Sequence, residues 1–130
     1  MKTGSSIANL QAVTLNAAMS EPFEIATGSK TEVNNVLVRI GLKDGTFGFG
    51  EGAPLPAFNG DDQAATLNAV LKQKDFLIGR DVLAWRALLQ ELDERLDGNQ
   101  GAARAALEMA ALDAWARCKK TPLRDRKSVV

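Results

Sequence analysis

The amino-acid sequence predicts an α+β fold, in which a small antiparallel β-sheet (a meander) is followed by a three-helix bundle. Apolar residues alternate at the strand period in the first half of the chain and recur at helical spacing in the second half. Strand and helix patterns do not alternate along the chain, as they do in parallel α/β proteins. The 130 residues, 45% of them hydrophobic, suffice for one domain with its own core.

The first half contains the strand signals. Alternation over 11–16 predicts one strand, and alternation over 36–42 predicts a second. Asp44-Gly45 then marks a tight reversal, because this dipeptide tolerates the positive φ that such a turn needs. The segment 46–51 is the expected return strand of this hairpin.

Glycines recur in the return strand. Gly48, Gly50 and Gly52 lie after a hairpin and lead to Pro54, whereas a dinucleotide fingerprint needs its glycines between a strand and a helix. Glycines inside a strand instead mark a bulge or the close approach of another backbone.

The second half contains the helix signals. Asp61 or Asp62 caps a first helix, and a second begins at Asp81 and stops before 97–99. Apolar residues at helical spacing identify both: Leu67, Val70 and Leu71 in the first helix, and Trp85, Leu88, Leu89, Leu92 and Leu96 in the second.

A third helix is expected over 101–118. Its surface offers Arg104–Glu108 and Asp113–Arg117 as i,i+4 ion pairs. Small side chains dominate its apolar stripe, which we expect to pack closely against a large element. The stripe comprises Leu107, Ala110, Ala111, Ala114 and Cys118.

Composition excludes several function classes. Sixteen basic and sixteen acidic residues cancel, so no field recruits nucleic acid or an anionic membrane. The absence of histidine removes the commonest general base and metal ligand. The lone Cys118 indicates a reducing, cytoplasmic location, and no apolar stretch at the N-terminus resembles a signal peptide. Glu51 is the one carboxylate in an unusual setting, and a hydrogen bond to a neighbouring loop explains it best.

Several segments together resemble a known family. Residues 21–23 with 26–29 and then 35–40 are similar to the opening of the muconate-lactonizing/mandelate racemase branch of the enolase superfamily, and 44–45 followed by 48–54 resemble its hairpin and the loop beyond. The most specific match is 103–117 with 121–123, which resembles the helix preceding the barrel in those enzymes. The resemblance implies an enolase-like N-terminal capping domain.

Within this branch, Asp62-Gln63 and 65–67, after the loop that contains Phe58, are most similar to dipeptide (L-Ala-D/L-Glu) epimerases. Such enzymes invert the α-carbon of the second residue in dipeptides such as L-Ala-L-Glu. Capping domains of muconate cycloisomerases and o-succinylbenzoate synthases are similar enough to remain alternatives.

The resemblance also implies a division of labour. The family's (β/α)8 barrel supplies acidic ligands for Mg²⁺ and lysine acid/base residues, so neither catalytic nor metal-binding residues are expected in this chain. The capping domain closes over the barrel with two loops, here 23–30 and 54–60. The substrate-binding residues implied on these loops are Phe23, Ile25, Thr27, Ser29, Leu55 and Phe58.

The resemblance fails near the end of the chain. Arg126, Lys127 and Ser128 stand where the family has apolar residues and glycine. We therefore expect the capping domain over 1–123, and over 124–130 the start of a linker or first barrel strand, without the barrel itself.

This organisation predicts an inactive chain whose partners are a dipeptide substrate and its missing barrel. The apolar face of the third helix is then left without the barrel, which favours association, homo-oligomers included. A non-catalytic binding module and a cap acting on a separately encoded barrel are the competing hypotheses.

Overall fold

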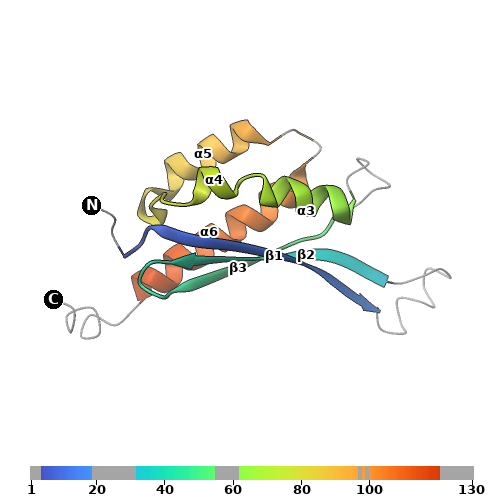
Figure 1. Cartoon of the computed structure of the whole chain (residues 1–130), viewed down its shortest axis with the longest axis horizontal. Coiled ribbons are helices and arrows are strands. Elements are labelled where there is room, and N and C mark those ends of the chain that lie inside the picture. The colour runs from blue at the N-terminus through green and yellow to red at the C-terminus, as the bar shows by residue number, and fades with distance from the viewer. Residues whose placement is uncertain (1–3, 19–31, 55–61, 97, 99, 121–130) are drawn as a thin grey trace.

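A computed structural model describes residues 4–18, 32–54, 62–96, 98 and 100–120. Three strands come first, β1 (Ile7–Ala18), β2 (Glu32–Leu42) and β3 (Phe47–Gly52). The helices follow as α3 (Gln63–Leu71), α4 (Lys74–Leu77), the 3₁₀ turn η1 (Val82–Ala84), α5 (Trp85–Arg95) and α6 (Gly101–Lys120). Figure 1 shows this order, and the predicted α+β class is confirmed.

The sheet is a three-stranded antiparallel meander in the order β1-β2-β3. The predicted hairpin joins β2 to β3, and Gly45 adopts a φ of 93° in its turn. The Asp44 carboxylate accepts a hydrogen bond from the Thr46 amide at 2.8 Å, which supports the reversal. Local turn chemistry therefore sets the pairing of these two strands.

Aspartate caps start the helical half, as predicted. Asp62 accepts a hydrogen bond from the Ala65 amide at 2.8 Å at the start of α3. Asp81 accepts from the Leu83 amide at 3.0 Å, but this cap begins η1, and regular α-helix starts only at Trp85. The predicted second helix is thus a 3₁₀ turn followed by α5.

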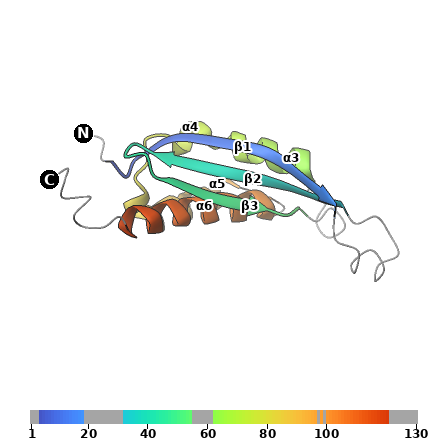
Figure 2. The ribbon, with the colours of Figure 1, turned by 90° about the horizontal axis from the view of Figure 1, so that it is seen from below.

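The helices cover one face of the sheet (Figures 1 and 2). Alternate residues of β1 and β2 point into this layer and are buried with the apolar faces of the helices. The largest of these side chains are Ile7, Val36, Val38, Ile40, Val70, Leu77, Val82, Leu88, Leu92 and Leu107. The core therefore lies between the inner face of the sheet and the helices.

The β3 glycines allow α6 to contact the strand backbone directly. A Cβ added at Gly50 would lie 2.0 Å from the Ala106 carbonyl oxygen, and one at Gly48 would lie 2.3 Å from that of Ala110. No side chain fits at these distances, so the predicted close approach of another backbone is confirmed.

This packing corrects the expectation for the third helix. Its alanine-rich stripe is buried inside the domain, with Ala110 and Ala114 fully covered, because β3 approaches the helix on that side. The large element is the domain's own sheet. The prediction that this stripe is exposed because the barrel is absent is therefore wrong.

A second stripe on α6 escaped the sequence analysis. Ala102, Ala105, Met109, Leu112 and Ala116 follow a spacing of three and four residues. At 100° per residue they occupy the side opposite the buried stripe, and Met109 is 50% exposed. A helix that is apolar on both sides is typical of one covered on both sides.

Candidate binding surface on the outer face of the sheet

The residues implied as substrate-binding lie outside the described part of the chain. This applies to Phe23, Ile25, Thr27, Ser29, Leu55 and Phe58. The proposed boundary at residue 123 and the segment 124–130 lie outside it as well. Candidate sites are therefore built here from the described residues alone.

The face of the sheet opposite the helices carries apolar side chains in solvent. Val13 is 55% exposed on β1, and Phe47 and Phe49 are 38% and 41% exposed on β3. Strand register places Val13 beside Leu37 and Arg39 beside Phe49. Exposed apolar side chains so close together form a patch, which typically marks an interaction site. We call this surface the outer sheet face.

Arg39 lies at the centre of the outer sheet face. Its guanidinium donates a hydrogen bond to the Gln11 side-chain oxygen and lies 4.4 Å over the Phe47 ring. Its Nε is buried and has no hydrogen-bond acceptor in the described part of the chain. A buried donor without an acceptor is costly, and its burial closes this atom to an incoming group.

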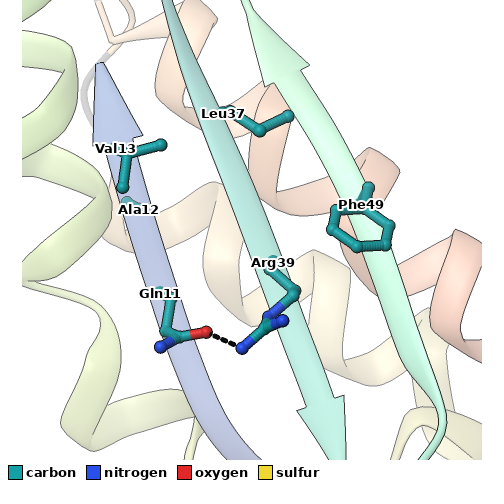
Figure 3. A pocket seen from close by; sticks show the side chains of 6 residues that line it. All are labelled: Gln11, Ala12, Val13, Leu37, Arg39 and Phe49. Atoms are coloured by element: carbon teal, nitrogen blue, oxygen red, sulfur yellow. Dashed lines mark hydrogen bonds between the residues drawn. The ribbon is translucent and has the colours of Figure 1, made fainter. Parts of the chain in front are cut away.

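The side chains around Arg39 border an open depression of about 310 Å³. Figure 3 shows Gln11 bonded to the guanidinium, Phe49 across from Arg39 on β3, and Val13 and Leu37 further along the strands. Apolar walls around one cationic group can bind an acidic side chain together with apolar neighbours. They provide no acid/base pair, so the depression is suited to binding and not to catalysis.

Two carboxylates near β3, those of Glu51 and Asp113, accept hydrogen bonds. Glu51 accepts from the Asn35 side-chain amide at 2.6 Å, so its partner is on the neighbouring strand and the prediction of a loop partner is wrong. Asp113 of α6 accepts from the Phe49 amide at 2.8 Å, which satisfies a donor on the open edge of β3. Asp113 also forms the predicted i,i+4 ion pair with Arg117, at 3.1 Å.

Glu108 has a perturbed environment but no catalytic geometry. Burial raises its pKa above the ordinary value, the Asp93 carboxylate raises it further, and Arg104 partly opposes them. Arg104 forms its ion pair with Asp93, at 3.2 Å between Nε and Oδ1, so this residue bridges α6 to α5. This structural network is sufficient to explain the raised pKa.

The described residues bring together no three histidine, cysteine, aspartate or glutamate side chains that could hold a metal ion. The Cys118 thiol is buried, with its sulfur 3.6 Å from the Asp44 carboxylate, and it packs as a small apolar group. Within the described ranges, no helix has the length and apolarity needed to span a membrane.

Comparison with known proteins identifies a family. The model of the mandelate racemase / muconate lactonizing enzyme N-terminal domain matches residues 8–125. The aromatic dipeptide epimerase of Herpetosiphon aurantiacus is 42% identical over 119 residues, which are 92% of this chain and 33% of that protein. The L-Ala-D/L-Glu epimerase of Bacillus subtilis is 32% identical, over 81% of this chain and 29% of that protein.

Solved structures agree with this assignment. The dipeptide epimerase of Methylococcus capsulatus, complexed with Mg and the dipeptide L-Arg-D-Lys, superposes with a TM-score of 0.75 at 32% identity. The match covers 92% of this chain and 33% of that one.

Muconate cycloisomerase 1 of Rhodococcus opacus is 30% identical over 93% of this chain and 33% of its own length. The chain thus spans about a third of the length of the relatives it matches.

Proposed function

Because the chain belongs to the mandelate racemase/muconate lactonizing enzyme family, as its N-terminal domain, we propose that it is the capping, substrate-specificity domain of a Mg²⁺-dependent dipeptide epimerase. The parent enzyme inverts the α-carbon of L-Ala-L-Glu-type dipeptides through an enediolate. The observation that carries this proposal is the similarity to dipeptide epimerases over nearly the whole chain. We also propose a cytoplasmic location, from the lone cysteine.

The strand arrangement supports the role of the two loops. Ala18 pairs with Glu32, so the chain segment between β1 and β2 leaves and re-enters the sheet at one end. Val36 pairs with Gly52 near that same end, where the second loop begins. The described strand residues that flank the two segments therefore lie toward one end of the sheet, which supports the proposal that both segments close over one substrate.

In this proposal the capping loops bind and orient the dipeptide and exclude water, while the barrel carries the chemistry. A bound Mg²⁺ stabilises the negative charge that develops on the substrate carboxylate when the α-proton is removed. Among the described residues no ligand set fits the ion, so the proposal places its ligands in the barrel. The chain alone is expected to have no epimerase activity.

The second stripe of α6, on the side away from β3, supports the proposal that the barrel domain packs against this helix. Met109 is 50% exposed between Ala105 and Leu112, on the helix that ends at Lys120. In the relatives, about two-thirds of the protein lies outside the region matched to this chain. We propose that the barrel packs on this stripe.

A chimera tests the capping function. Residues 1–123 replace the matching segment of the Bacillus subtilis enzyme, and α-proton exchange in deuterated water is followed for L-Ala-L-Glu and for an aromatic dipeptide. We expect Mg²⁺-dependent exchange of the α-proton. We also expect that Phe23→Ala or Phe58→Ala in the chimera changes the preference between the two dipeptides. A folded chimera that exchanges neither dipeptide contradicts the proposal.

The dipeptide class itself is tested by the same chimera. Preference for the aromatic dipeptide would align this domain with the Herpetosiphon aurantiacus relative and overturn the L-Ala-L-Glu assignment. A muconate cycloisomerase cap remains the second candidate, because a muconate cycloisomerase matches over 93% of this chain. Two further alternatives are the cap of an o-succinylbenzoate synthase and a non-catalytic binding module. A chimera that exchanges the α-proton of no dipeptide would favour them.

A further inference from the structure

We propose that Gln63 is a positioning residue for substrate binding, which together with Asn35 ties the strand and helix ends that flank the two capping loops. The inference rests on the proposed function, because it concerns the loops that are proposed to bind the dipeptide. The observation behind it is a set of three hydrogen bonds, donated by two side-chain amides, that crosses one end of the sheet.

Gln63 links the start of α3 to the two strands that flank the first capping loop. Its side-chain amide donates to the Asn16 side-chain oxygen at 2.7 Å and to the Asn35 main-chain oxygen at 2.8 Å. Asn16 lies near the end of β1, and Asn35 lies near the start of β2. A main-chain carbonyl can only accept, so the Gln63 amide has to present its NH₂ group here, and that group has one hydrogen for each acceptor.

Asn35 extends this link to the second capping loop. Its side-chain amide donates to the Glu51 carboxylate at 2.6 Å. Glu51 lies next to Gly52, the last residue of β3, and the second loop follows this strand in the chain. Gln63 is the first residue of α3, the helix that follows the same loop. The two amides therefore connect the described residues on both sides of both loops.

The start of α3 has its own support without Gln63. The Asp62 side chain caps this helix, and Val70 anchors it in the core. The four linked residues, by contrast, are exposed or half-buried. Removing the bonds should therefore loosen the relative placement of the loop flanks and leave the core packed. A dipeptide held by both loops would then bind less tightly, because binding groups act together only when they are held in the correct geometry.

Substitution of Gln63 in the chimera described above tests this role. Gln63→Leu removes both donated hydrogen bonds, and it should raise the KM for the preferred dipeptide about tenfold while kcat changes less than about threefold. A substitution that only destabilised the fold would lower the amount of active enzyme, and so the apparent kcat, and would leave KM unchanged. Asn68→Leu, at an exposed position on the same helix, is the matched control and should change neither constant.

Glu51 provides a matched pair of variants at the other end of the link. Glu51→Leu removes the acceptor of the Asn35 amide and should raise KM, whereas Glu51→Gln keeps a side-chain oxygen there and should not. Combining Gln63→Leu with Glu51→Leu should raise KM by less than the product of the two single effects, because both residues act through Asn35. Circular dichroism confirms that each chimera is folded, and the Glu51 pair serves if Gln63→Leu unfolds.

Nuclear magnetic resonance of the chain itself provides a measurement that needs no barrel. Gln63→Leu should speed hydrogen exchange of the Asn16 and Asn35 side-chain amides and of the main-chain amides near them, and leave that of Val38, in the buried part of β2, unchanged. Faster exchange without any change in KM would show that the bonds support only the fold, and would overturn the positioning role.

The outcomes separate this inference from the proposed function. If the unsubstituted chimera exchanges a dipeptide, an unchanged KM in folded Gln63→Leu overturns the inference alone, and so do single effects that multiply in the double variant. If the unsubstituted chimera folds and exchanges neither dipeptide, the proposed function fails and the inference fails with it.

Discussion

The two faces of β3 alternate residue by residue but meet different environments. Gly48 and Gly50 face inward, where a single added carbon would collide with the α6 backbone. Phe47 and Phe49 face outward and remain more than a third exposed, at 38% and 41%. The small residues are therefore covered by the domain, and the large apolar ones are not.

This contrast indicates which contacts the domain completes by itself. The inner face and α6 fit each other closely, so the fold needs no further partner there. The outer face combines exposed aromatic rings with a buried Arg39 donor that has no acceptor in the described ranges. Exposed apolar area with an unsatisfied polar group is the pattern expected of an incomplete interface.

The largest expected effect is on the inner face. Gly50→Ala places a Cβ where the Ala106 carbonyl oxygen stands 2.0 Å away, so α6 must move from β3. We expect a loss of about 3 kcal/mol in the free energy of unfolding, measured in urea. Gly101→Ala is the control, because a Cβ there meets nothing within 4 Å. Equal stability of Gly50→Ala and wild type would show that β3 and α6 are not closely packed.

A smaller effect is expected at the edge between the two faces. Asp113→Ala removes the acceptor of the Phe49 amide and the ion pair with Arg117. We expect a loss of about 1 kcal/mol, and faster hydrogen exchange of the Phe49 amide by NMR. Arg117→Ala removes the ion pair alone and is the control for the edge hydrogen bond. Unchanged exchange in Asp113→Ala would contradict the contact.

Glu108 provides a pH-dependent effect. Its raised pKa means that the folded protein holds the proton more tightly than the unfolded chain does, chiefly because of burial. Its stabilising contribution is therefore present at low pH and is lost as pH rises above the ordinary glutamate value of about 4.3. Glu108→Gln should raise the midpoint of unfolding at neutral pH relative to wild type.

The advantage of Glu108→Gln should shrink as pH falls, because the wild-type carboxyl then becomes neutral too. Glu94→Gln, exposed on α5, is the matched control and should show no comparable trend. Thermal unfolding at several pH values measures the difference. A constant advantage at every pH would show that side-chain packing, and not charge, produces the effect.

The smallest effect is expected on the outer face. Val13→Thr keeps the side-chain shape at a position that is 55% exposed. We expect a change within about 0.5 kcal/mol in the free energy of unfolding, measured in urea. A large loss would mean that the outer face already stabilises the single chain and would remove the contrast between the two faces.

Short-range signals predicted much of the fold. The Asp44-Gly45 turn, the Asp62 cap and the strand alternation were sufficient because each acts over a few residues. The pairing of Arg104 with Asp93 was not predicted, since helical spacing offers Glu108 and says nothing about α5. The capping loops stay predictions, because their residues lie outside the described ranges.

The sequence by itself determined the elements, their order, the family resemblance and the glycines that allow a close approach. Only the tertiary structure decided which element approaches these glycines. The hydrophobic effect is non-directional, so an apolar stripe in the sequence does not specify which element will pack on it. On α6 two stripes share one helix, and packing against β3 covered the alanine side and left Met109 exposed. The burial of Arg39 Nε likewise depends on strands distant in sequence, whose register places Gln11 and Phe49 on either side of it.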